Sequence, residues 1–130
     1  MLKQLRRALA SEFGATIVEF ALVAGISTIL FVGLLDLTRL AYVSTLLQAG
    51  AQEGARYGIA HFDDTNGIQQ AALERLVGID PDAAEVTITY PSDDEITVTI
   101  TYDFELITAF AIDLFNGNPI VLRGSATMVR

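Results

Sequence analysis

An uncharged apolar run from Phe20 to Leu35 constrains this chain more than any other feature of its sequence. Extended back to Ala15, the run has twenty-one residues and one charge, Glu19. A helix rises about 1.5 Å per residue, so this length crosses the roughly 30 Å hydrocarbon core of a bilayer. We therefore expect one transmembrane helix over residues 15–36, and the sequence contains no second run of this kind.

Charge is distributed unevenly along the chain, whose formal net charge is −8. Residues 1–14 carry a net charge of +2, because Lys3, Arg6 and Arg7 outnumber Glu12. Residues 63–130 carry twelve acidic and three basic side chains, a net charge of −9. Basic flanks of a span stay on the cytoplasmic side. We therefore expect a single-pass protein of the inner (cytoplasmic) membrane, with a cytoplasmic amino terminus and a periplasmic or extracellular acidic domain.

Composition excludes several classes of function. The chain contains no Cys, which excludes disulfide frameworks, thiol nucleophiles and zinc–thiolate sites. Nucleic-acid binding needs a basic face, which the acidic outer half cannot provide. The single histidine, His61, has no partner at a recognisable catalytic spacing, and no glycine-rich phosphate loop is present. We expect no catalytic residues, no metal, no cofactor and no nucleic-acid partner.

A cleaved secretory signal peptide is an alternative for the amino-terminal segment, because it also starts basic and continues apolar. The apolar run is long, however, and no small-residue cleavage site follows Leu35. Glu19 is the anomaly inside the run, since a carboxylate near the centre of a span costs about 2.5 to 3.5 kcal/mol. On spacing alone, Glu19 reaches the cytoplasmic interface by snorkelling.

The stretch Gly14-Ala15-Thr16-Ile17-Val18-Glu19-Phe20 follows the short basic leader and opens the apolar run. It resembles the cleavage and assembly motif of type IVb (Flp-class) prepilins. More specifically, the chain resembles the TadE-like family of the tight-adherence secretion system, whose members are small pseudopilins. Similar stretches follow at residues 34–39 and 48–58, and again at residues 97–102 and 124–129.

The resemblance implies roles for individual residues. Gly14 would be the last leader residue before the prepilin peptidase cut, Ala15 the mature amino terminus, and Phe20 the aromatic residue after the glutamate. Glu19 would be the recognition and assembly carboxylate, paired with the free amine of Ala15 on the same or a neighbouring subunit. Opposite charges attract strongly in a medium of low dielectric constant. The chain departs from the family at Asp36, where the family more often has Glu followed by an aromatic residue and Gly.

Beyond the span, helical periodicity continues, and we expect the helix to extend over residues 37–60. Gly50, Gly54 and Gly58 lie four residues apart and form a bare strip that permits close helix packing. The strip faces either its own domain or the helix of a neighbouring subunit. Asp36 and Arg39, three residues apart, are expected to form a solvated surface pair of little energetic value.

The remaining sequence, residues 61–130, is typical of a small α+β domain. Alternating apolar residues and threonines predict half-buried strands. Acidic clusters near residues 80–85 and 93–95 read as solvated turns rather than calcium sites, because they lack an EF-hand spacing. The expected elements are a loop at 61–67, a helix at 68–77 ended by Gly78, strands at 85–90, 96–104 and 120–129, and a helix or irregular bridge at 106–115.

The predicted fold class is therefore α+β, with a long amino-terminal transmembrane helix that extends into a domain with a short helix and a three-to-four-stranded antiparallel sheet, a lollipop-like pseudopilin. We expect a leader at 1–14, a span at 15–36, its continuation at 37–60 and the domain at 61–130. The expected function is that of a minor pseudopilin or assembly component of a tight-adherence (Flp-type) pilus. Its partners would be the prepilin peptidase, other pilins or pseudopilins in homo- or hetero-oligomers, and pilus platform proteins. The alternative is a membrane-anchored extracytoplasmic binding or envelope interaction module that keeps residues 1–14.

Overall fold

The computed structural model describes residues 2–110 and 119–130. The first element, helix α1, runs from Leu2 to Ala60. The chain divides into two compact units, Met1–Leu35 and Asp36–Arg130, and α1 contributes to both.

From Phe13 to Leu35 the first unit is an apolar helix, in which Glu19 is the single charged side chain. Between Phe13 and Leu35 no side chain is buried, and large residues such as Phe20, Leu30 and Phe31 are largely exposed. Among the described residues, α1 is the one helix long and apolar enough to cross a membrane. A helix without a polar face requires an apolar solvent. This unit therefore has the properties of a single-pass membrane span.

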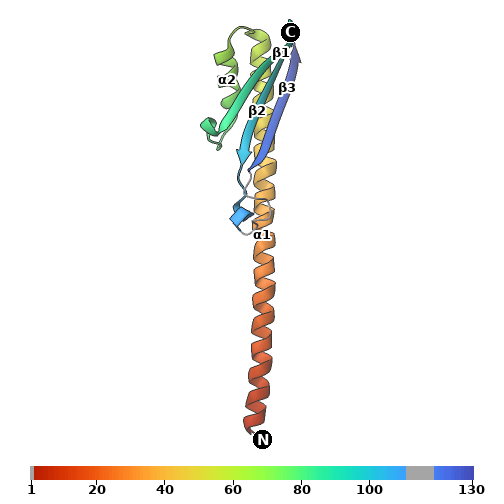
Figure 1. Cartoon of the computed structure of the whole chain (residues 1–130), viewed down its shortest axis with the longest axis vertical. Helices are drawn as coiled ribbons and strands as arrows, with labels where there is room; N and C mark the ends of the chain where they lie inside the picture. The colour runs from red at the N-terminus through yellow and green to blue at the C-terminus, as the bar shows by residue number, and fades with distance from the viewer. Residues whose placement is uncertain (1, 111–118) are drawn as a thin grey trace. The chain divides into compact units, whose positions relative to one another are not determined.

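The second unit combines residues 36–60 of α1 with a second helix and one sheet. Figure 1 shows α2 and the three strands beside this part of α1. The sheet has the order β1-β2-β3, and both strand pairs are antiparallel. The elements are α2 (Thr65–Leu73), the 3-10 helix η1 (Pro81–Ala83), β1 (Ala84–Ser92), β2 (Glu95–Phe104), the 3-10 helix η2 (Ile107–Phe110) and β3 (Ile120–Val129). The predicted α+β class is confirmed, with three strands in the described sheet.

The core of this unit lies between the sheet, α2 and one face of α1. Alternate residues of β2 are buried, because successive side chains of a strand point to opposite faces. The opposite face of the sheet carries mostly threonine and serine, and Thr97 and Thr99 bond to the hydroxyls of Thr127 and Ser125. The core comprises Val43, Leu47, Ala51 and Ala55 of α1, Ile68 and Ala72 of α2, Leu76, Ile79, and Ile96, Val98, Ile100 and Phe104 of β2.

Helix α2 begins and ends earlier than the sequence predicted. Asp64 caps its amino terminus, because the Asp64 carboxylate accepts a hydrogen bond from the Gly67 N–H at 3.0 Å. The predicted loop residues up to Gly67 therefore include the first turn of the helix. The helix ends at Leu73, and Gly78, with φ of 82°, lies in the turn beyond it. The ambiguous stretch 106–115 begins with η2, and its residues 111–115 lie outside the described residues.

Candidate functional site

The residues of the predicted cleavage motif lie on the first part of α1. Lys3, Arg6 and Arg7 fall within its helical backbone. Gly14 and Ala15 are exposed, and a Cβ added at Gly14 would meet no atom within 4 Å. The Gly14–Ala15 bond is therefore not covered by the rest of the chain within the described residues.

Glu19 and Phe20 are also exposed on α1, and Phe20 is 74% exposed. Residues at adjacent positions of a helix point about 100° apart, so these two side chains leave the helix in different directions. Ala15 lies four residues before Glu19, which places it one turn away on the same face. A charge on the Ala15 nitrogen would therefore be within reach of the Glu19 carboxylate.

Asp36, the first residue of the second unit, is the most heavily bonded side chain in the structure's described part. Its side chain is only 3% exposed. The backbone N–H groups of Ile107 and Thr108 donate to its carboxylate at 2.9 and 2.7 Å. Thr108 Oγ1 donates at 2.6 Å and Arg39 Nη1 at 3.2 Å. An ionised carboxylate is acceptor-only, so this group matches four donors.

The expectation of a solvated Asp36–Arg39 pair is wrong. The pair forms, but Asp36 is buried because it also caps the first N–H groups of η2. The Arg39 guanidinium in turn lies 5.1 Å from the centre of the Phe104 ring, at the end of β2. Asp36 and Arg39 thus fasten η2 and the end of β2 to α1.

The glycine strip of α1 faces α2 and β2 of its own domain. A Cβ at Gly50 would come within 2.7 Å of the Ala72 carbonyl oxygen and 2.9 Å of Ile100 Cδ1. A Cβ at Gly58 would collide with Ile96. Gly54 lies between them and is buried in the same way. Of the two alternatives for the strip, the structure supports packing within the domain.

Gln48 of α1 pairs with the outer edge of β3. Its Nε2 donates to the Ser125 carbonyl at 2.9 Å, and its Oε1 accepts from the Ser125 N–H at 3.3 Å. Both backbone groups of Ser125 therefore point away from β2, toward the open edge of the sheet. Next to them, Gly124 packs so closely on the backbone of Leu47 that a Cβ would collide with it. The amide of Gln48 thus occupies the middle of an edge that could otherwise pair with another strand.

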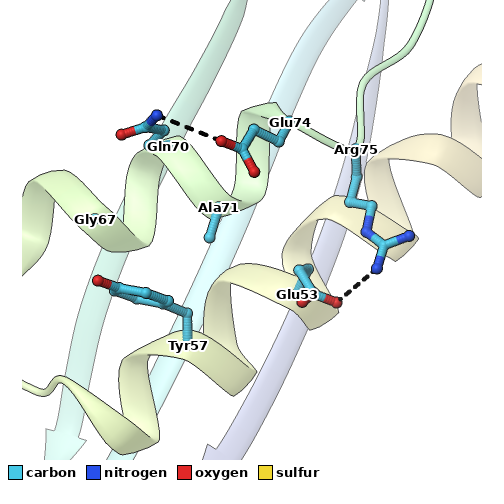
Figure 2. A pocket seen from close by; sticks show the side chains of 7 residues that line it. All are labelled: Glu53, Tyr57, Gly67, Gln70, Ala71, Glu74 and Arg75. Atoms are coloured by element: carbon cyan, nitrogen blue, oxygen red, sulfur yellow. Dashed lines mark hydrogen bonds and ion pairs between the residues drawn. The ribbon is translucent and has the colours of Figure 1, made fainter.

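An open groove of about 560 Å³ lies at the surface between α1 and α2 (Figure 2). Glu53 of α1 pairs with Arg75 at 3.2 Å across it, and Gln70 donates to Glu74 at 3.3 Å. The Glu53 and Arg75 side chains are substantially exposed to solvent. Because these charged groups already satisfy one another, the groove presents no convergent set of unpaired groups to a ligand.

Tyr57 and Asp64 form a second polar contact, between the end of α1 and the cap of α2. Tyr57 Oη donates to Asp64 at 3.0 Å, and the Tyr57 ring stacks on His61 with 4.5 Å between centroids. Hydrogen bonds from the Gly67 N–H and then from Tyr57 lower the pKa of Asp64. The bond to Asp64 raises the pKa of Tyr57. The contact is a structural clasp rather than a reactive pair, since neither group faces an enclosed cavity.

The carboxylate of Asp80 binds the backbone of its own turn. Asp80 accepts a hydrogen bond from the Asp82 N–H at 3.1 Å and caps η1. Within residues 2–110 and 119–130, no three acidic or histidine side chains gather as a metal-ion site would require.

A family model described as TadE-like protein matches residues 14–56. This segment is TadE-like. The TadE-like segment begins at the predicted cleavage residue and continues through the apolar helix to the glycine strip. The match covers 43 of the 130 residues of the chain. Comparison of the chain with curated proteins and with solved structures gave no match.

Inside the TadE-like segment, sequence reasoning gave Asp36 the wrong environment and missed Gln48. Asp36 is a buried cap, and Gln48 occupies a strand edge. Both contact residues more than seventy positions away in the chain, in η2 and β3. The local sequence signal for Asp36 is its position directly after the apolar run. That position does not indicate that Ile107 and Thr108 donate hydrogen bonds to its carboxylate.

Proposed function

We propose that this protein is a minor pseudopilin or assembly component of a tight-adherence (Flp-type) pilus system. In this proposal a prepilin peptidase removes residues 1–14, and the mature helix holds the protein in the cytoplasmic membrane with its second unit outside. The observation that carries the proposal is the TadE-like match, which starts at Gly14 and covers the whole apolar helix.

The exposure of the cleavage motif supports processing. Gly14 and Ala15 are not covered by the described residues, and Gly14 has no neighbour that a side chain would strike. A change at Gly14 should therefore act on recognition by the peptidase and leave the fold intact.

Processing would give Glu19 a partner. The new ammonium group of Ala15 would lie one helical turn from the Glu19 carboxylate, on the same or a neighbouring subunit. A buried charge in a membrane is strongly destabilising unless it is paired. This requirement would favour assemblies in which every Glu19 meets an amino terminus, and other pilins or pseudopilins are the partners that offer one.

The first experiment is intact-mass measurement and amino-terminal sequencing of the full chain, expressed in membranes with and without a prepilin peptidase. We expect a mature start at Ala15 only when the peptidase is present. Gly14→Leu should abolish the shortening, whereas the matched control Gly25→Leu should not. Gly25, like Gly14, has no atom within 4 Å of an added Cβ.

Two results would overturn processing. One is a fully shortened product from Gly14→Leu. The other is an intact Met1 start in the presence of a peptidase that cleaves a known prepilin in the same cells. The second result would favour the anchored interaction module, which keeps its basic leader.

Glu19 is tested separately from cleavage. Because the chain has no Cys, a single cysteine at Ala21 gives a clean cross-linking probe between neighbouring helices. Glu19→Gln should reduce cross-linking to the pilus subunits several-fold, while the control Glu53→Gln, in the second unit, should leave it unchanged. Equal cross-linking in both variants would show that Glu19 plays no part in assembly.

A further inference from the structure

The two edges of the sheet differ in how the rest of the domain protects them. At the β3 edge, the amide of Gln48 binds both backbone groups of Ser125. At the other edge, within residues 2–110 and 119–130, β1 pairs with β2 alone. An unpaired strand edge is a template for another strand, and proteins usually protect it. One edge of this sheet is therefore protected, and the other is free.

The direction of the backbone groups of β1 follows from the register of the sheet. Ser125 lies opposite Thr99 and directs its N–H and C=O away from β2, so these two residues do not bond to each other. Thr99 therefore directs its own N–H and C=O toward Thr87, its partner in β1. Successive residues alternate, so Val86 and Ile88 direct theirs away from β2. Among the described residues, these four backbone groups have no hydrogen-bond partner.

The free length of β1 is bounded at both ends. At its start, the N–H of Ala84 bonds to the Pro81 carbonyl and is unavailable. Near its end, the register shifts after Thr89, and Pro91 has no N–H to donate. Residues 84–89 remain, with a length of about 20 Å that matches a typical short strand. We call residues 84–89 the β1 edge.

The side chains of the β1 edge suit a fourth strand. Val86 and Ile88 pack against the core and are half-buried, so each keeps apolar surface in contact with water. Thr87 and Thr89 are exposed on the opposite face, beside threonines of β2. A strand added here would cover the remaining surface of Val86 and Ile88 with its own alternate side chains. Apolar β-branched residues at every second position of a partner meet this need.

Charge around the β1 edge selects a basic partner. The sequence from residue 76 to residue 122 contains no Lys, Arg or His. Exposed carboxylates lie toward both ends of the edge, those of Asp80, Asp82 and Glu85 at its start and those of Asp93 and Asp94 in the hairpin that follows β1. Opposite charges on paired strands stabilise the pairing, and like charges oppose it.

A second copy of the chain does not fit this edge. Two β1 edges paired antiparallel would bring the carboxylates at the start of one copy beside those in the hairpin of the other, which like-charge repulsion opposes. The β3 edge of a second copy carries Arg123, but Gln48 already occupies its middle. Charge and the protected β3 edge therefore favour a different protein as the partner.

We propose that the β1 edge binds an extended basic segment of a partner protein, which joins the sheet as a fourth strand. The backbone groups of Val86 and Ile88 supply the hydrogen bonds, and alternate side chains and the nearby carboxylates supply the specificity. The inference goes beyond the proposed function and does not depend on processing at Gly14.

Binding is measured by fluorescence anisotropy, with the full chain in uncharged detergent micelles and a labelled short peptide. The probe peptide has lysine at both ends and valine alternating with threonine between them. A second peptide has glutamate in place of lysine. A third keeps the lysines but is N-methylated at every residue between them, so it retains its charge and cannot donate backbone hydrogen bonds.

Two pairs of variants test the edge. Val86→Pro removes an N–H that points away from β2, so it closes the edge without breaking the ladder. Val129→Pro is its matched control, because Val129 lies four residues after Ser125 and by the same alternation directs its N–H away from β2. Glu85→Lys changes only an exposed side chain, so it tests the edge even if Val86→Pro unfolds the domain. Its control is Glu105→Lys, at an exposed position beyond the end of β2.

We expect the lysine peptide to bind several-fold more tightly than the glutamate peptide, and the N-methylated peptide not to bind. Val86→Pro and Glu85→Lys should each weaken binding of the lysine peptide several-fold. Val129→Pro and Glu105→Lys should leave it unchanged.

Three results would overturn the inference. Equal binding of the N-methylated peptide, or unchanged binding in a folded Val86→Pro variant, would reduce the contact to charge attraction without strand addition. Binding of no peptide, or a preference for the glutamate peptide, would exclude a basic strand as the partner. Self-association of the chain that Val86→Pro abolishes would identify a second copy as the occupant of the edge.

Discussion

Helix α1 has two parts whose side chains need different surroundings. From Phe13 to Leu35 the helix has no buried face, and large apolar residues point in every direction. From Asp36 to Ala60 one face carries Val43, Leu47, Ala51 and Ala55 into the core, while residues such as Gln48 and Gln52 remain exposed. The first part needs a solvent that the chain does not supply, whereas the second part is stabilised by its own domain.

Because of this difference, a substitution of glycine has a different effect on the free energy of unfolding in the two parts of the helix. A Cβ added at Gly14, Gly25 or Gly33 would meet nothing within 4 Å, but at Gly50 it would strike α2 and β2. Substitutions in the second part should therefore act on folding. Substitutions in the first should act on membrane insertion, processing and assembly.

The largest contrast should come from two leucines of α1. Leu47 is fully buried, so Leu47→Ala removes core packing and should lower the unfolding free energy of the second unit by about 3 kcal/mol. Leu30 is 68% exposed, and Leu30→Ala should change this free energy by less than about 0.5 kcal/mol. Urea unfolding of the full chain in detergent micelles, followed by the near-UV tyrosine signal, measures both. If both variants lowered the free energy of unfolding by a similar amount, the proposed difference between the two parts of the helix would be wrong.

The boundary between the two parts can be tested at Asp36. Asp36→Ala leaves the buried N–H and hydroxyl of Thr108 without an acceptor, which should cost about 2 kcal/mol. Asp36→Asn keeps one acceptor oxygen and should cost less. Asp103→Asn, at an exposed position, is the control with no expected loss. The same urea titration applies, and an unchanged midpoint in Asp36→Ala would show that η2 is not held by this carboxylate.

A smaller effect is expected at the exposed edge of the sheet. Gln48→Ala removes two hydrogen bonds to Ser125, but water can replace them, so the unfolding free energy should fall by about 1 kcal/mol. The variant also opens the middle of the β3 edge, and its tendency to associate should increase. Sedimentation in micelles, with Gln52→Ala as the control on the same helix, detects this change. Stable, unassociated protein would mean that Gln48 does not protect the edge.

The smallest effect concerns pH and the clasp at the far end of the helix. The Gly67 N–H and the Tyr57 hydroxyl lower the pKa of Asp64 below its ordinary value of 3.8. A lowered pKa in the folded state gives stability that is present above the unfolded pKa and is lost as the pH falls through the folded pKa. Stability should therefore decrease with acidification below pH about 4. Asp64→Asn, which still caps α2, should weaken this dependence in unfolding curves recorded at several acidic pH values, and Tyr57→Phe should weaken it partly. Identical acid dependence in all three proteins would contradict the role of Asp64.

Sequence reasoning succeeded where structure depends on local pattern. The uncharged run ending at Leu35 predicted the apolar helix among the described residues, alternating threonines predicted β1 and β2, and the segment 120–129 was predicted as the third strand, all close to the observed bounds. It was less successful at α2, where Asp64 begins the helix within a stretch of turn-forming residues. Asx caps and loops use the same residue types, so the sequence alone did not separate them.

The sequence by itself determined the apolar helix and the α+β class, and it predicted a basic leader and a cleavage motif, because each depends on hydrophobicity, charge or period along a short segment. Only the tertiary structure decided that Asp36 is buried, that Gln48 occupies the edge of β3, and that Gly50, Gly54 and Gly58 lie against their own domain. Those contacts join α1 to elements that come later in the chain. Local pattern does not encode such pairings, since they exist only when the sheet has folded onto the helix.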